Sequence, residues 1–362
     1  MKILLVRLRL IGDVVFTTPL LAGLRRRFPD AELTYVVEPA AAPVVLGNPH
    51  LTDVVVVPKA SGIARLRSDL TTARALRRRR FDVAIDLHGG PRSAWLARLS
   101  GAPMRIGYRI AGRSWMYTHL VERPADNGPR HSVLNQWDLL EPLGIEPCDP
   151  ERYPVEMIED QQAAERLTRH LERAGIPSSA PLVVVHVSAG NPFRRWPADA
   201  FVSVLEQLAR QDPTRRIVVT SGPSEASAAE AIARRARQRL AGLADAIASV
   251  PEFDLQELHS LIRRSALFIG GDSGPMHIAA TTETPIVALL GPTLPERSMP
   301  WRAPTAYGEG VDAGPLPCRP CRQRVCEPGD FRCLTRITPE RVVAAAGRAL
   351  ASKGRNDVHS RT

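Results

Sequence analysis

Short apolar runs alternate with longer stretches of helical spacing along almost the whole chain. The apolar runs predict buried strands, and the stretches between them predict amphipathic helices. The predicted strands are residues 2–6, 32–37, 54–57, 83–87 and 105–108 in the first half, then 182–187, 216–220, 266–269 and 285–290 in the second. Because parallel strands need a crossover helix, this alternation predicts doubly wound α/β sheets.

The predicted helices fall between these strands. They cover residues 14 or 17–28, 63–80, 131–143, 159–174, 198–211, 225–240, 255–265 and 339–352. Gly175-Ile176-Pro177 and Pro181 interrupt the pattern, so we expect a linker at residues 176–181. The prediction is an N-terminal Rossmann-like domain over residues 1–176 and a second one over 181–338. A C-terminal helix over 339–352 and a disordered tail over 353–362 complete it.

One stretch carries the clearest local signal, residues 266–293, which read ALFIGGDSGPMHIAATTETPIVALLGPT. A buried strand ends in two glycines, Asp272-Ser273-Gly274-Pro275 makes a turn, and a short helix and a second strand follow. Ser or Gly caps a helix well and Pro suits its first turn. The free amides of such a turn favour an anion. A capped turn that binds nothing is the alternative.

Composition narrows the class of protein. The 362 residues are 44% apolar and 24% charged, with a formal net charge of +10. This excess of positive charge suits nucleotide phosphates, nucleic acid or anionic lipid. The start of the chain has no secretory pattern and no apolar run reaches the roughly 18–20 residues of a membrane span, so we expect a cytoplasmic protein.

Two arginine runs stand at helix ends in the first half, at residues 25–27 and 77–80. They are either a solvated surface that complements helix C-termini or a surface for an anionic membrane. Nucleic acid is not an expected partner, because no binding motif accompanies the charge. A Rossmann dehydrogenase is also disfavoured, since neither half has a G-x-G-x-x-G turn after a strand.

Three segments together resemble the family 9 glycosyltransferases, the bacterial ADP-heptose:lipopolysaccharide heptosyltransferases and their relatives. They read RLRLIGDVVFTTPLLAGLR, HVSAGNPFRRWP and GGDSGPMHIAATTETPIVALLGPTLPERSMPW; DLHGGPRSAWLARLSGAPMRIGYR and the cysteine tail followed by LTRITPERV agree with them. The resemblance implies a GT-B fold, in which two Rossmann-like domains face each other across a cleft. It places the sugar-nucleotide donor mostly on the C-terminal domain and the acceptor on the N-terminal one.

Asp13 is the candidate catalytic base. Glycosyl transfer with inversion needs a group that takes the proton of the acceptor hydroxyl. A carboxylate at the carboxyl end of the first strand, beside Gly12, is suited to this, and Gly12 leaves room for substrate. A plain helix N-cap is the alternative from the residues alone. The resemblance implies that the matching Asp acts as the base.

The candidate donor contacts lie in the second half. Asp272, Ser273, Gly274 and His277 are expected around the diphosphate and sugar. Arg194 stands where the family usually has Lys, and a cation there would offset charge on the departing diphosphate.

Further contacts are expected beside this site. Ser188 departs from the family's usual Gly and is expected near the donor. Ser221, Gly222 and Glu225 follow the next strand, which the resemblance places near the nucleoside. Phe253 is a weaker candidate for covering the adenine.

Four of the five cysteines cluster near the C-terminus, namely Cys318, Cys321, Cys326 and Cys333, while Cys148 lies apart. One Cys-x-x-Cys invites a structural zinc, but the spacing lacks the paired knuckles of a zinc ribbon. Reduced thiols are the other interpretation. No metal or cofactor is expected in catalysis.

The prediction is therefore an inverting, metal-independent glycosyltransferase. It moves a sugar, heptose from ADP-heptose, onto a lipopolysaccharide inner-core or related lipid-linked glycan acceptor, with peripheral contact to the membrane. Two alternatives stay open: a sugar-nucleotide epimerase of GT-B shape, and a non-catalytic nucleotide- or glycolipid-binding protein.

Overall fold

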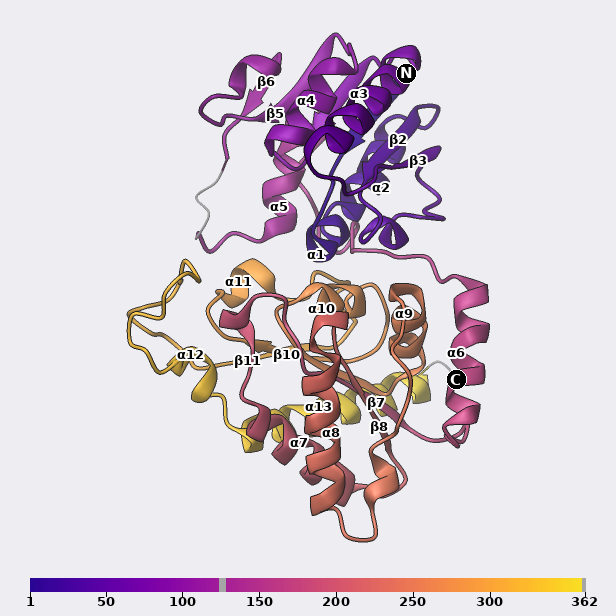
Figure 1. Cartoon of the computed structure of the whole chain (residues 1–362), viewed down its shortest axis with the longest axis vertical. Helices are drawn as coiled ribbons and strands as arrows, with labels where there is room; N and C mark the ends of the chain where they lie inside the picture. The colour runs from indigo at the N-terminus through magenta and orange to yellow at the C-terminus, as the bar shows by residue number, and fades with distance from the viewer. Residues whose placement is uncertain (124–127, 360–362) are drawn as a thin grey trace. The chain divides into compact units, whose positions relative to one another are not determined.

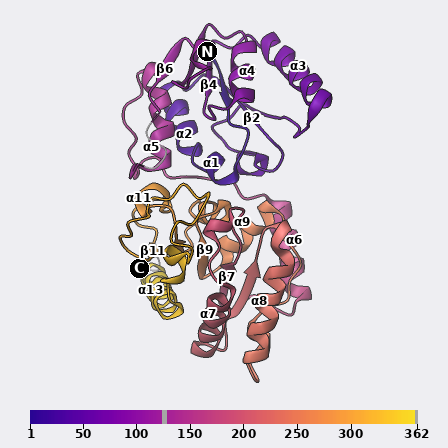
Figure 2. The same ribbon diagram turned by 60° about the vertical axis from the view of Figure 1, so that its left-hand side comes forward.

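The computed structural model describes residues 1–123 and 128–359, which form two compact units (Figures 1 and 2). The first unit is Met1–Ile158 and the second is Glu159–Thr362. The boundary therefore precedes the linker expected at residues 176–181. Helix α6 (Gln161–Arg173) belongs to the second unit, because Arg166 pairs with Asp254 and Glu257 there at 2.7 and 2.9 Å. The Gly and Pro residues that suggested a linker follow α6, but the residues that α6 contacts come later in the sequence.

Parallel strands form the sheet described in the first unit, in the order β3-β2-β1-β4-β5-β6. Their bounds are β1 Lys2–Val6, β2 Glu32–Val37, β3 Asp53–Val56, β4 Val83–Asp86, β5 Met104–Tyr108 and β6 His119–Val121. This is the Rossmann strand order. Strands β2 and β3 lie on one side of β1, and β4, β5 and β6 lie on the other, so the topological switch point lies between β1 and β4. Strand β6 was not predicted.

Helices cover both faces of this sheet. They are α1 Ile11–Val15, α2 Thr18–Arg27, α3 Gly62–Arg78, α4 Pro91–Leu99 and α5 Ser132–Trp137. Helix α3 packs against α4, and α2 packs against α5 on the other face (Figure 2). Of the two starts expected for the first helix, Thr17 is the correct one: it is the N-cap of α2, which has Pro19 in its first turn, and Ile11–Val15 form the separate helix α1. Gly12 and Asp13 thus lie inside α1.

The second unit repeats the architecture with another strand order, β11-β10-β9-β7-β8, again parallel over the described residues. The strands are β7 Leu182–His186, β8 Arg216–Thr220, β9 Leu267–Gly271, β10 Ile286–Leu290 and β11 Gly308–Asp312. Numbered from β7, this is the flavodoxin-like order, whose reversal lies between β7 and β9. The prediction of doubly wound α/β sheets is confirmed in both units, and β11 is an addition to it.

Most helices of the second unit fall into two groups according to which other elements they pack against. Their bounds are α6 Gln161–Arg173, α7 Ala198–Gln211, α8 Ala226–Arg239, α9 Leu255–Arg264, α10 Gly274–Ala279, α11 Pro295–Ser298, α12 Arg332–Thr335 and α13 Pro339–His359. Helices α7, α8 and α13 pack on the core that contains Val183, Val185 and Ile269, all fully buried. Helices α6, α9 and α10 form the other group.

The C-terminal helix is longer than predicted. Helix α13 continues to His359, seven residues past the expected end at residue 352. The remainder of the expected tail, residues 360–362, lies outside the described residues. Within the described part of the chain, no helix combines the length and apolar character needed to cross a lipid bilayer.

Candidate active site

Each sheet reverses its strand order at one point, and the candidate residues gather at those points. In open α/β sheets, ligands bind at the carboxyl ends of the strands that flank the reversal. In the first unit Asp13 follows β1, and β4 is the neighbouring strand across the reversal. In the second unit Ser188 follows β7 and Asp272 follows β9. The order of the strands, which the sequence did not show, thus brings the predicted residues to the expected ligand edge.

Asp13 is held from one side by an arginine that sequence reasoning missed. The Arg7 guanidinium places Nη2 2.5 Å from Asp13 Oδ2 and donates from Nη1 to the Leu87 carbonyl at 2.5 Å. The Asp13 side chain remains 32% exposed. The only sequence signal for Arg7 was its place just after β1. The carboxylate is thus paired with Arg7 and is still partly accessible to a substrate hydroxyl.

The loop after β4 is shaped by a buried carboxylate. Asp86 accepts hydrogen bonds from the His88 and Gly89 amides, both at 2.9 Å, and from the Tyr117 hydroxyl at 2.6 Å. Burial raises the pKa of Asp86, and the hydrogen bonds oppose that rise. Burial also lowers the pKa of His88 to about 4, so its ring is neutral at pH 7. The loop beside Arg7 is therefore rigid and adds no charge from its histidine.

In the second unit, Asp272 collects two predicted cationic or protonatable side chains. Arg194 Nη1 lies 3.0 Å from Asp272 Oδ2, and His277 Nε2 lies 3.3 Å from Oδ1. Burial alone would raise the pKa of Asp272, but the hydrogen bond from His277 and the charge of Arg194 hold it below its ordinary value. Ser273 is the N-cap residue of α10 and Gly274 its first residue. Asp272 thus forms ion-pair contacts with both Arg194 and His277.

Ser188 joins the loop after β7 to the turn after β8. Its hydroxyl accepts the Gly222 amide at 2.8 Å and lies 3.1 Å from His186 Nε2, while His186 Nδ1 lies 3.1 Å from the Thr220 hydroxyl. Burial lowers the pKa of His186 to about 4, so the ring is neutral. The Gly222 amide donates to Ser188, and the remaining contacts join Ser188, His186 and Thr220 in one chain whose direction depends on which ring nitrogen of His186 carries the proton. The Ser188 hydroxyl and the Gly222 amide are therefore engaged with each other.

Glu225 is likewise engaged within the protein. Its carboxylate lies 2.8 Å from Arg195 Nε, and its side chain is only 12% exposed. This ion pair is a second tie between the same two loops. The structure therefore gives Glu225 a partner that the sequence did not reveal.

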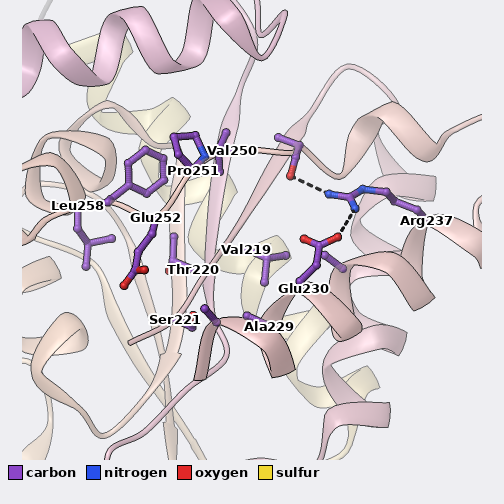
Figure 3. Close-up of a pocket in the computed structure, with 14 residues that line it drawn as sticks. Val219, Thr220, Ser221, Ala229, Glu230, Arg237, Val250, Pro251, Glu252 and Leu258 are labelled. Atoms are coloured by element: carbon purple, nitrogen blue, oxygen red, sulfur yellow. Dashed lines mark hydrogen bonds and ion pairs between the residues drawn. The ribbon is translucent and has the colours of Figure 1, made fainter. Parts of the chain in front are cut away.

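A pocket opens beside these loops, at the carboxyl end of β8 (Figure 3). The cavity has a volume of about 100 Å³. The wall consists of Val219, Thr220, Ser221, Ala226, Ala229, Glu230, Ala233, Arg237, Ala248, Val250, Pro251, Glu252, Phe253 and Leu258. Of the predicted nucleoside contacts, Ser221 and Phe253 line this pocket, whereas Gly222 and Glu225 lie outside its wall.

Three charged residues of this wall were missed, namely Glu230, Arg237 and Glu252. Glu230 and Arg237 lie on α8 and pair at 3.1 Å, as Figure 3 shows. With Ala226, Ala229 and Ala233 they recur at helical spacing, so they share one face of α8. That spacing is readable in the sequence. What the sequence lacks is a sign that this face lines a cavity.

The described cysteines form no disulfide. Within the described residues, no three His, Cys, Asp or Glu side chains are placed to hold a metal ion. Burial raises the pKa of Cys333 to about 11, and the neighbouring thiols act in the same direction.

Two Rossmann-type units, each with its candidate residues at the strand reversal, define a nucleotide-dependent enzyme of GT-B architecture. Solved structures with this architecture match over nearly the whole chain. A family 9 glycosyltransferase from Veillonella parvula superposes with a TM-score of 0.81 at 24% identity, covering 97% of each chain. The ADP-heptose lipopolysaccharide heptosyltransferase II of Escherichia coli gives 0.76 at 20% identity, covering 98% of this chain and all of the other.

The sequence comparison identifies the family. The model of glycosyltransferase family 9 (heptosyltransferase) matches residues 70–330. Lipopolysaccharide heptosyltransferase 3 of Escherichia coli K12 is 29% identical over 300 residues, covering 80% of this chain and 82% of that protein. The chain belongs to glycosyltransferase family 9. It is a glycosyltransferase, as the sequence predicted.

Proposed function

We propose that the chain transfers a heptosyl residue from ADP-heptose to a lipopolysaccharide inner-core or related lipid-linked acceptor, with inversion at the anomeric carbon. The observation that carries the proposal is the continuity of the donor side. Ser188 ties the pocket-side turn at Gly222 to the loop that carries Arg194, and Arg194 contacts Asp272. The similarity to heptosyltransferases supports heptose and ADP as the donor components.

On the donor side, the pocket at the end of β8 would take the nucleoside. Its aliphatic and aromatic wall suits a base, and Glu252 or Ser221 offers polar contacts at its edge. The diphosphate would then extend toward Arg194, whose side chain is 31% exposed. A fixed guanidinium stabilises negative charge that grows on the leaving diphosphate. The donor side thus binds the nucleotide and assists its departure.

On the acceptor side, Asp13 is the proposed general base. The acceptor oxygen attacks the anomeric carbon, the bond from that carbon to the β-phosphate oxygen breaks, and ADP leaves with the electron pair. The hydroxyl proton passes to Asp13 Oδ1, while Arg7 holds Oδ2. Neither unit alone carries both roles, because Asp13 belongs to the first and Arg194 to the second.

The test compares Asp13→Asn with wild type, using ADP-heptose and a lipid-linked acceptor. Loss of a general base should lower kcat by about 10²–10⁴-fold. The affinity for ADP should not change, because its proposed contacts lie in the second unit. The matched control is Asp30→Asn, an exposed carboxylate of the same unit, which should leave turnover unchanged.

Three outcomes would count against the proposal. Full turnover by Asp13→Asn would remove Asp13 as the base. Tight binding of UDP compounds and none of ADP compounds would overturn the donor. ADP release that does not require an acceptor would indicate an epimerase-like or hydrolytic reaction in place of transfer.

The proposal extends to contact with an anionic membrane, where a lipid-linked acceptor lies. One arginine of the two runs at residues 25–27 and 77–80 makes hydrogen bonds within the protein: Arg25 donates to the carbonyls of Ala31 and His50 at 2.8 and 2.9 Å. Arg26 and Arg78 are exposed and remain candidates. Changing both to Gln should weaken co-sedimentation with phosphatidylglycerol vesicles, and added salt should do the same to wild type. Equal binding of the variant to these vesicles would contradict the role.

A further inference from the structure

The segment Pro315–Cys333, here called the cysteine segment, is fastened to the loops at the carboxyl edge of the second sheet. Arg319 Nη2 donates to the Thr293 carbonyl at 2.6 Å, and the Cys321 amide donates to the Pro292 carbonyl at 3.3 Å. Farther along, the Phe331 ring lies 5.6 Å from the Phe193 ring, measured between centroids. The segment therefore packs against two loops of the second unit: one follows β10, and the other carries Arg194.

One polar side chain of this segment enters the donor side. Gln323 Oε1 accepts hydrogen bonds from Arg194 Nε at 2.7 Å and from Asn191 Nδ2 at 2.8 Å. Both partners can only donate through these atoms, so the amide oxygen of Gln323 must face them. Asn191 in turn accepts the Phe193 amide at 3.0 Å and caps the short turn before Arg194. Gln323 thus contacts both the functional arginine and the residue that shapes its loop.

The backbone at Gln323 is held in an uncommon conformation. Its φ is +56°, in the left-handed region that residues other than Gly, Asn and Asp seldom adopt. The Gln323 amide donates to Cys321 Sγ at 3.2 Å within the segment. Such conformations persist where the surroundings hold them, and they cluster at functional sites. Here the conformation aims the side chain at Arg194.

We propose that Gln323 is a positioning residue for the donor diphosphate, acting through Arg194. The guanidinium of Arg194 is anchored at Nε by Gln323 and at Nη1 by Asp272, whose Oδ2 and carbonyl lie 3.0 and 3.2 Å away. Two anchors determine the plane of the guanidinium. Among the described residues, Nη2 has no partner, so this edge is left for phosphate oxygens. The inference rests on the proposed function, since it assumes that Arg194 contacts the diphosphate.

The test uses Gln323→Asn, since Asn keeps an amide and tolerates the left-handed backbone but is one methylene too short to reach Arg194. Calorimetry should give ADP binding about tenfold weaker than wild type, the order expected for a lost charge-assisted hydrogen bond. Adenosine, which has no phosphate, should bind equally to both. Val325→Ala, a 71% exposed residue of the same segment, is the control and should change neither.

A double-mutant cycle separates positioning from a general structural role. If Gln323 acts through Arg194, Gln323→Asn should have no further effect on ADP affinity in an Arg194→Ala background. Additive losses in the cycle would overturn the inference, and so would unchanged ADP affinity in the single variant. If the wild-type chain binds no ADP, the proposed function fails and this inference fails with it. If the wild type binds ADP but the variants behave as just described, only the inference about Gln323 fails.

Discussion

The hydrogen-bonded chain from Gly222 through Ser188 and His186 to Thr220 makes a quantitative prediction for Ser188→Ala. Removing the hydroxyl leaves the Gly222 amide and His186 Nε2 without their partner at 2.8 and 3.1 Å. A buried polar group without a partner costs about 1–3 kcal/mol. His186 is 2% exposed and bears this cost in full, while water can reach the half-buried Gly222 turn. We therefore expect a loss of about 2–3 kcal/mol in the free energy of unfolding of the second unit.

Calorimetric unfolding at pH 7 measures this loss. For a unit of this size it corresponds to a drop in Tm of about 5–10 °C. Ser221→Ala is the matched control, because the Ser221 hydroxyl makes no hydrogen bond within the described residues, and its Tm should change little. A Ser188→Ala variant as stable as the Ser221→Ala control would refute the reasoning. It would mean that the two loops are held together without the serine.

Three further outcomes follow from the same structure. Because the pKa of His186 is lowered from 6.5 to about 4 by burial, the unfolded chain binds the extra proton first, so stability falls as pH drops from about 6.5 to 4. This pKa difference corresponds to about 3 kcal/mol of unfolding free energy. In denaturant titrations at several pH values, His186→Asn should lack this part of the pH dependence. A variant whose stability changes with pH as that of wild type does would contradict the prediction. Ala226→Leu on the pocket wall should weaken ADP binding about tenfold in calorimetry, while Ser227→Leu, one residue along and outside the wall, should not; equal affinities would exclude the pocket as the nucleoside site. In Gly107→Ala the new Cβ would lie 2.5 Å from the Tyr117 ring, which its hydrogen bond to a buried carboxylate holds in place, so urea unfolding of the first unit should show a loss of about 1–3 kcal/mol. Gly347→Ala, where no atom lies within 4 Å, should be neutral or stabilising, and a loss equal to that of Gly107→Ala would argue against the clash.

Local pattern alone predicted the central strands and most of the helices. Strands β1, β2, β7 and β10 are buried over most of their length, so their sequences are mainly apolar and readable without a structure. The edge strands β6 and β11 were missed for the same physical reason. His119 is exposed in β6, and Gly308 and Gly310 are exposed in β11, so neither strand has an apolar run. The other two edge strands, β3 and β8, were predicted because each keeps a run of Val or Ile.

Part of the candidate site could also be predicted from the sequence, and part could not. The sequence by itself determined the turns that carry Asp13, Arg194 and Asp272, because each follows an apolar strand within a few residues. It also placed the chain in a family, which the comparisons confirmed. Residue type and local spacing were sufficient for these conclusions, since a strand, its turn and its helix are formed by neighbours in the chain.

Only the tertiary structure decided which of these side chains are partnered, and by whom. Arg7 meets Leu87, 80 residues away, and Arg194 meets Asp272 and Gln323, 78 and 129 residues away. Glu225 pairs with Arg195, a neighbour that local pattern does not reveal. Such pairs depend on strand order and loop packing, and no local pattern encodes them. Hydrophobic periodicity reports burial along one element, whereas a site is assembled from the ends of several.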